Sequence, residues 1–230
     1  CVMELGGNDP CLILADADIK KAAEVCVKAR MVVSGQVCIS PKRVIVVRSV
    51  YEEFKDHVIN SLACIRYGDP LSEDTDMGPL ARADLRDQLH QQVLQAITDG
   101  ATLLMGGEMP KGNGFYYPPT LLDGVTPGSI VFNEELFGPV VSLVVAQDES
   151  HAVSMANDSE YGLGATVFTC DRVRAEKIAR SLQVGCCYVN TSVSSHPLLP
   201  FGGIKNSGFG RELGQEGLLA FMNHKTISIC

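Results

Sequence analysis

The sequence contains no apolar run long enough to cross a membrane. Its longest runs, such as Val140 to Ala146, fall far short of the roughly 20 residues that a spanning helix needs. The chain does not open with a basic and then apolar signal segment. Its net charge is −8 at pH 7, and it contains no block of Lys and Arg. The positive surface that binds nucleic acid or an anionic membrane is therefore missing. We expect neither as a partner.

Patterned cysteines and histidines are also missing. The nine cysteines are an odd number and contain no C-x-x-C pair, so neither a disulfide framework nor a zinc ribbon is indicated. The five histidines are dispersed, and neither H-E-x-x-H nor an EF-hand loop occurs. These absences predict no metal site and favour a reducing, cytoplasmic compartment.

The known phosphate-binding loops are absent as well. No G-x-G-x-x-G follows a strand-like segment, and the glycines of residues 202–207 do not have P-loop spacing. We therefore do not expect this segment alone to hold the phosphates of a cofactor.

The composition that is present is that of a globular protein. The chain has 230 residues, of which 46% are hydrophobic and 20% charged, enough to bury a core in one large domain or two small ones. It opens on Cys1 rather than Met, with only Val2 and Met3 ahead of the motif Glu4-Leu5-Gly6-Gly7. We expect it to be a piece of a longer chain.

Helical periodicity begins close to the N-terminus. Residues 16–18 can cap a helix with one apolar face, which we expect to run from Ile19 to about Val33. Residues 34–36 end it, and the β-branched run Arg43 to Val47 predicts a buried strand. Cys38 is therefore expected on a loop between a helix and a strand.

Helices and strands alternate along the rest of the chain, apart from an irregular stretch at residues 111–119. The expected helices are Tyr51–Ile65, a segment carrying Leu85 to Ile97 that stops at Gly100, His151–Asn157, Arg172–Leu182 and Arg211–Phe221, and the expected strands are Val140–Val145, Ala165–Thr169 and Cys186–Val189. This alternation predicts an α/β fold of three layers, a mainly parallel sheet with helices on both faces. A last strand, Lys225–Ile229, is expected to pair with another subunit.

Cys38 differs from the other cysteines in its context. Small and polar residues lead into it on a loop that a carbonyl group can approach, but a nucleophilic thiol needs its pKa lowered from about 8.5. By itself this pattern favours a structural role over a catalytic one. The cysteines in apolar segments are expected to be small buried hydrophobes: Cys11, Cys26, Cys64, Cys186 and Cys187.

Three other segments are ambiguous on their own. Glu4 precedes two glycines, where a backbone can approach a ligand closely. Glu135 belongs to an acidic pair beside a turn, and Phe137 next to Gly and Pro can wall a flat ligand. Phe201 lies in a glycine-rich segment that is also compatible with a plain turn.

Taken together, these segments resemble the signatures of the aldehyde dehydrogenase superfamily. Residues 4–7 are similar to its glutamate signature and residues 35–38 to its cysteine signature. Further matches follow in the family's order over essentially the whole chain: Met77–Leu80, Glu134–Pro139, Asn157–Leu163, Gly185–Asn190 and Pro200–Gly208. Residues 6–8 and 218–226 most resemble the succinate-semialdehyde dehydrogenases of that superfamily.

The resemblance implies that residues 1–230 are the catalytic domain of an enzyme that uses NAD or NADP to oxidise an aldehyde. Most of the nucleotide-binding domain, and the side-chain amide of the oxyanion hole, precede the glutamate signature in this family and are absent from this segment. The resemblance also implies a homo-oligomer for the full-length protein.

The implied mechanism uses two residues of this chain. The Cys38 thiolate attacks the aldehyde, the thiohemiacetal passes a hydride to the nicotinamide, and Glu4 activates the water that hydrolyses the remaining thioester. The backbone N–H of Cys38 is one donor to the oxyanion. The remaining implied contacts are Glu135 to the nicotinamide ribose, Leu5 and Phe137 to the nicotinamide side, and Phe201 to the aldehyde tunnel.

Two departures and two alternatives accompany this interpretation. Ser40-Pro41 follows the cysteine where the family more commonly has an Ala-Gly type of sequence, a difference that bears on the substrate. No second cysteine stands two places after Cys38, so a redox switch between two such cysteines is not expected. The alternatives are a cysteine hydrolase or acyltransferase that pairs Cys38 with a histidine, and a non-catalytic folding or assembly fragment.

Overall fold

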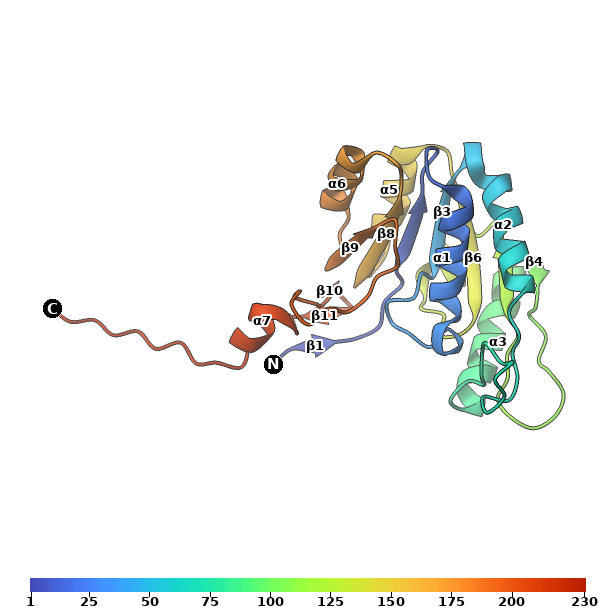
Figure 1. Cartoon of the computed structure of the whole chain (residues 1–230), viewed down its shortest axis with the longest axis horizontal. Helices are drawn as coiled ribbons and strands as arrows, with labels where there is room; N and C mark the ends of the chain where they lie inside the picture. The colour runs from blue at the N-terminus through green and yellow to red at the C-terminus, as the bar shows by residue number, and fades with distance from the viewer.

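A seven-stranded sheet forms the centre of the structure, a computed structural model that describes all 230 residues (Figure 1). Neighbouring strands are parallel except at one edge, where the first strand is antiparallel to the second. In spatial order the strands are β4 (Thr102–Met105), β5 (Thr120–Asp123), β6 (Val140–Ala146), β3 (Arg43–Val47), β2 (Pro10–Ile13), β8 (Gly164–Phe168) and β9 (Cys186–Val189).

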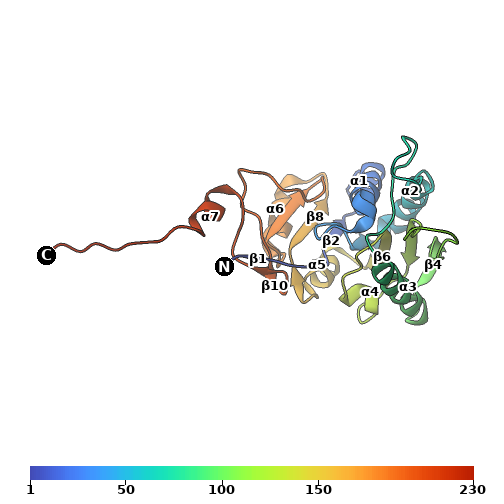
Figure 2. The ribbon, with the colours of Figure 1, turned by 90° about the horizontal axis from the view of Figure 1, so that it is seen from below.

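Helices cover both faces of this sheet (Figure 2). Helices α1 (Ile19–Met31) and α2 (Tyr51–Ala63) pack on one face, and α3 (Ala83–Thr98), α5 (Glu149–Asn157) and α6 (Arg172–Ser181) pack on the other. Successive side chains of a strand point to opposite faces, so alternate residues of β2, β3 and β6 enter two separate apolar cores. The predicted three-layer α/β fold is confirmed.

Helix α1 shows how local sequence sets the bounds of an element. The Asp18 side chain accepts a hydrogen bond from the Lys21 N–H at 3.1 Å, which caps the helix. The helix ends at Met31, slightly before the predicted end, because Val33 and Ser34 adopt positive φ angles of 50° and 57°. Cys38 follows on a loop, as predicted.

Most other predicted elements are confirmed to within a turn, and three strands of the central sheet were not predicted. Strand β2 has only four residues, all of them buried, and β4 and β5 flank the irregular stretch at residues 111–119. Such short strands carry too few residues for a periodic pattern.

Of the two expectations for the C-terminal region, one is wrong, and the other, a strand that pairs with another subunit, stays a prediction. The helix predicted for Arg211–Phe221 is only α7 (Gly214–Leu219), because Phe201 and Glu212 exchange two backbone hydrogen bonds of 2.8 Å that hold the chain extended before it. Residues 225–229 form no strand and extend away from the body of the molecule (Figure 1). A strand needs a neighbour to bond with, and this segment has none within the chain.

The cysteine expectation also needs correction. Cys11 and Cys26 are buried, as expected, whereas Cys186 and Cys187 are half-buried. Cys64 is exposed because it follows the last residue of α2, beyond the apolar face of that helix.

Two small ribbons lie at one end of the sheet, next to the N-terminus (Figure 1). Strand β1 (Met3–Glu4) pairs with β11 (Gly208–Phe209), and β7 (Tyr161–Gly162) pairs with β10 (Ile204–Lys205). A short helix, α4 (Ile130–Asn133), precedes β6. None of the helices combines the length and the apolar character that spanning a membrane requires.

Candidate active site

The segments singled out in the sequence meet at the amino-terminal edge of the sheet. Residues 4–9 precede β2, residues 38–42 precede β3, and residues 135–139 precede β6. These three strands are parallel neighbours in the order β6-β3-β2, so their first residues lie at the same edge. The structure thus brings together stretches that are far apart in the sequence.

Two glycines allow the Glu4 segment to pass close to the other two. A side chain on Gly6 would collide with the carboxylate of Glu135, and one on Gly7 would come within 2.9 Å of the Cys38 carbonyl oxygen. Only a residue without Cβ fits at such distances. These glycines therefore let the Glu4 segment pack closely against the Glu135 carboxylate and the backbone of Cys38.

The loop of Cys38 begins with a run of left-handed backbone. Val33, Ser34 and Gly35 have φ angles of 50°, 57° and 74°, and this conformation is costly for a β-branched residue such as Val33. A turn follows in which the Ser40 N–H donates to the Val37 carbonyl at 3.2 Å. Cys38 lies in this turn, half-buried, and its own N–H makes no hydrogen bond within the chain.

The groups around the thiol shift the pKa of Cys38 in opposite directions. Burial raises the pKa of Cys38, the charge of Lys42 and the N–H of Ile39 lower it, and the charges of Asp9 and Glu135 raise it again. The net shift is upward. These surroundings therefore disfavour the thiolate, the form that attacks a carbonyl.

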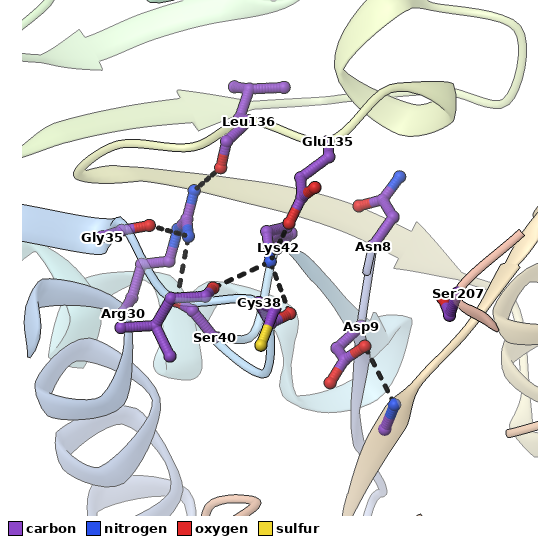
Figure 3. Close-up of polar contacts among 12 residues, drawn as sticks. Asn8, Asp9, Arg30, Gly35, Cys38, Ser40, Lys42, Glu135, Leu136 and Ser207 are labelled. Carbon is purple, nitrogen blue, oxygen red and sulfur yellow. Dashed lines mark hydrogen bonds and ion pairs between the residues drawn. The ribbon is translucent and has the colours of Figure 1, made fainter. Parts of the chain in front are cut away.

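Lys42 is a residue at this site that the sequence analysis missed. Its Nζ donates to the carbonyl oxygens of Cys38 at 2.7 Å and Val37 at 3.0 Å, and lies 3.0 Å from Glu135 Oε1 (Figure 3). The available signal was a lysine directly before the wholly buried strand β3, where the ammonium needs buried partners.

Arg30 is a second missed residue, and it ties the loops together from inside α1. Its guanidinium donates to the Leu136 carbonyl at 2.7 Å and to Ser40 Oγ at 2.9 Å (Figure 3). It donates to the Val140 carbonyl at 2.6 Å as well. It also reaches the Gly35 carbonyl at 3.3 Å. One buried side chain thus connects the loop of Cys38 to the segment of Glu135.

Glu4 lies on β1 with a half-buried carboxylate. Its pKa is raised, first by burial and then by the charge of Glu212, against a backbone hydrogen bond from Gly203 and the charge of Arg211. The charge of Glu4 also acts on the thiol of Cys186, which packs in one small cluster with Cys38. Glu4 and Cys38 therefore both lie close to Cys186.

The remaining predicted residues lie around this centre. Phe201 is buried in that same small cluster, against Leu163 and Val193. Phe137 is 41% exposed, with the Lys42 ammonium 5.9 Å from its ring centroid, and Leu5 is 47% exposed beside Glu4. No group of three or more His, Cys, Asp or Glu side chains is placed to hold a metal ion.

One observation sets this edge apart from the rest of the molecule. Buried side-chain oxygens and nitrogens almost always have a hydrogen-bond partner, and in this chain the exceptions are Glu4 Oε1, Asn8 Oδ1, Asp9 Oδ2 and Glu135 Oε1. All four lie in the segments described above, and the last has only its ion pair with Lys42. Hydrogen-bonding capacity is therefore left open at this one place.

Comparison with known proteins agrees with this geometry. Residues 1–227 match the sequence profile of the aldehyde dehydrogenase family. The chain belongs to this family. Among its relatives, a succinate semialdehyde dehydrogenase [NAD(P)+] of Escherichia coli is 45% identical over 99% of the chain and 49% of the relative. A probable succinate-semialdehyde dehydrogenase [NADP(+)] of Synechocystis is 43% identical over 99% of the chain and 50% of the relative.

Solved structures of the family have the same fold. The chain superposes on Gox0499 with a TM-score of 0.96 and 42% identity, over 100% of the chain and 50% of that structure. It superposes on betaine aldehyde dehydrogenase of Staphylococcus aureus in complex with NAD+ with a TM-score of 0.92 and 33% identity, over 96% of the chain and 44% of that structure. The chain thus spans about half the length of the curated relatives that it matches.

Proposed function

We propose that this chain is the catalytic part of an NAD(P)-dependent aldehyde dehydrogenase. The observation that carries the proposal is the open hydrogen-bonding capacity around a half-buried thiol, at the edge where the glutamate and cysteine segments meet. Family membership supports it, as do relatives described as succinate-semialdehyde dehydrogenases and a related structure in complex with NAD+.

The chemistry assigned to the chain begins at Cys38. Its thiolate forms a bond to the aldehyde carbon, and the oxygen that becomes negative accepts a hydrogen bond from the free N–H of Cys38. A nicotinamide held beside Leu5 and Phe137 would supply the acceptor for a hydride from that carbon, which would then remain attached to Cys38 as a thioester. The raised pKa of Cys38 means that a base must first take the thiol proton.

Glu4 is assigned the hydrolysis of the thioester. A general base works best when its pKa lies near the working pH, and burial and the charge of Glu212 move the pKa of Glu4 in that direction. The unpartnered Oε1 of Glu4 is free to accept a proton from water. Attack by that water on the thioester releases the carboxylic acid and restores the thiol.

The residues present fit a nicotinamide cofactor. The carboxylate of Glu135 is mostly buried and can accept hydrogen bonds from ribose hydroxyls, which matches its unused capacity. The exposed apolar surfaces of Leu5 and Phe137 suit the face of a nicotinamide ring. We assign the same three residues to cofactor binding, and Phe201 to the aldehyde tunnel.

For the whole protein we infer further properties. The relatives favour a semialdehyde such as succinate semialdehyde as the substrate. The exposed side chains of Ile227 and Ile229 on the C-terminal segment support pairing with a second subunit in a homo-oligomer. Nine free cysteines support a reducing, cytoplasmic compartment.

The test uses the full-length protein with a panel of aldehydes that includes succinate semialdehyde, and with NAD or NADP. We expect dinucleotide reduction that falls to background in Cys38→Ser and is unchanged in Cys64→Ser, since Cys64 is exposed directly after α2. Iodoacetamide inactivation should track alkylation of Cys38. Inactivation that followed Cys186 or Cys187 instead would refute the assignment, and ester hydrolysis with no aldehyde oxidation would indicate a cysteine hydrolase.

A further inference from the structure

The buried ammonium of Lys42 touches parts of the site that belong to different steps of the proposed reaction. Its side chain is 1% exposed, and it lies between Glu135 on one side and Cys38 on the other (Figure 3). The three N–H donors of a lysine are matched here by two carbonyl oxygens and one carboxylate oxygen. The ammonium also lies 5.9 Å from the ring centroid of Phe137.

Filling this space with a buried ammonium group costs free energy. A buried charge loses its hydration, and an apolar side chain of similar volume often stabilises a protein as well as a buried ion pair does. Lys42 shares its surroundings with one like charge, Arg30, and two opposite charges, Asp9 and Glu135. Stability alone therefore does not account for a cation at this position.

We propose that Lys42 is a positioning residue, whose ammonium holds the carbonyl of Cys38 and the carboxylate of Glu135 in a fixed relation and supplies positive charge to the thiol. The inference rests on the proposed function, in which Cys38 is the nucleophile and Glu135 holds the cofactor ribose. Lys42 touches neither substrate nor cofactor in this view and acts through those two residues.

Asp9 provides the opposing charge that makes the inference testable. It is buried, with Oδ1 accepting the Gly164 N–H at 3.0 Å and Oδ2 without a partner. Burial raises the pKa of Asp9 to about 7 against the charge of Lys42. Lys42 lowers the pKa of the Cys38 thiol, whereas Asp9 and Glu135 raise it. Loss of Lys42 and loss of Asp9 should therefore change the thiol in opposite directions.

The experiment follows alkylation of Cys38 by iodoacetamide across a pH series, in the full-length protein without cofactor or aldehyde, with peptide mapping to confirm the residue. We expect Lys42→Met to move the midpoint upward and to slow alkylation at neutral pH by roughly 3- to 10-fold, and Asp9→Asn to move the midpoint downward. Lys55→Met is the matched control, because Lys55 also contacts two carboxylates but at the opposite end of the sheet. It should leave the profile unchanged.

A second readout separates position from charge. The double variant Lys42→Met with Asp9→Asn removes both buried charges, so its alkylation midpoint should lie between those of the single variants. Its KM for the dinucleotide should still rise by about 10-fold, since Glu135 loses its cation and its fixed orientation. If Lys42→Met alone does not fold, this double variant decides the matter by its KM.

The outcomes that overturn the inference are specific. An unchanged alkylation profile in Lys42→Met, shifts of the same sign in Lys42→Met and Asp9→Asn, or an unchanged dinucleotide KM in the double variant would each do so. Failure of the proposed function looks different, because Cys38→Ser would then retain aldehyde oxidation. Aldehyde oxidation that requires Cys38 but is unaffected by substitution of Lys42 would refute only the role proposed for Lys42.

Discussion

The two ends of the central sheet carry similar charged groups in opposite settings. At the amino-terminal end, Lys42 and Glu135 pair at 3.0 Å with side chains that are 1% and 17% exposed. At the carboxyl-terminal end, Arg174 and Asp16 pair at 3.3 Å with side chains that are 41% and 35% exposed. An exposed pair costs little and contributes little, whereas a buried one pays a large desolvation penalty. The buried pair, with its desolvation penalty, lies at the amino-terminal end, where we expect the chemistry.

Hydrogen bonding separates the two ends in the same way. At the carboxyl-terminal end Thr169 Oγ1 donates to Asp16, and Asn190 both accepts from the N–H and donates to the carbonyl of Thr169. At the amino-terminal end three buried oxygens have no hydrogen-bond partner, and a fourth, on Glu135, has only its ion pair with Lys42. Ligands of open α/β sheets usually bind at the carboxyl ends of the strands. In this chain the unsatisfied buried groups lie at the opposite, amino-terminal ends.

The largest effect that would sharpen this comparison is expected for Glu4→Gln. The carboxamide keeps the size of the side chain but cannot accept a proton, so thioester hydrolysis should slow while hydride transfer continues. Turnover of the full-length enzyme should fall by about 10²- to 10⁴-fold, the usual contribution of a general base. Rapid mixing should show a burst of one equivalent of NADH followed by a nearly flat line, with an acyl adduct on Cys38 by intact mass.

Glu52→Gln is the control for that variant, because Glu52 is an exposed carboxylate on α2 that pairs only with Lys55 at 2.7 Å. It should turn over at the parental rate. Parental turnover in Glu4→Gln itself would return Glu4 to a structural role, and loss of the burst would mean that Glu4 acts earlier, on the proton of Cys38.

The next largest effect is expected on stability, for Arg30→Met. The substitution keeps most of the apolar stem but leaves the carbonyls of Leu136, Val140 and Gly35 buried without their donor. Each such group costs about 1–3 kcal/mol, so we expect the free energy of unfolding to fall by about 3 kcal/mol or more. Denaturant unfolding of the full-length protein measures this, and a loss below about 1 kcal/mol would show that the loops are held mainly by other contacts.

Much of this fold could be predicted from the sequence, because the spacing of apolar residues in a segment indicates both the type of element and its buried face. Helices α3 and α6 and strand β6 show apolar residues at the spacing of their element, and the structure has them where the pattern predicts. The short strands β2, β4 and β5 were not predicted, since four residues give no period to measure. The strand expected at residues 225–229 stays a prediction, because its pairing depends on another subunit.

The candidate site was readable only in part. Cys38 and Glu4 stand in short motifs with small residues around them, which sequence can show. Lys42 and Arg30 were missed because their role follows from burial, and burial of a cation depends on carbonyls contributed by other segments of the chain. A charged residue next to a fully buried strand is the sequence signal that such partners exist.

The smallest effect is expected at the carboxyl-terminal end, for Arg174→Ala. Arg174 lies 3.3 Å from Asp16 and 3.5 Å from Glu149 in exposed pairs, so its loss should lower the free energy of unfolding by no more than about 1 kcal/mol and leave aldehyde oxidation unchanged. Burial alone would raise the pKa of Asp16, but hydrogen bonds from Thr169 and the charge of Arg174 lower it overall.

That lowered pKa fixes the pH dependence of the Arg174→Ala effect. A carboxylate whose folded pKa lies below its unfolded value stabilises the fold above the unfolded value, here 3.8, and loses that contribution as the pH falls through the folded pKa. The difference between parent and variant should therefore be present at neutral pH and disappear in acid. Denaturant midpoints of parent and variant measured across a pH series test this. If Arg174→Ala lowered the free energy of unfolding by more than Arg30→Met does, the contrast between the two ends would be reversed, because the exposed pairs would then stabilise the sheet more than the buried contacts.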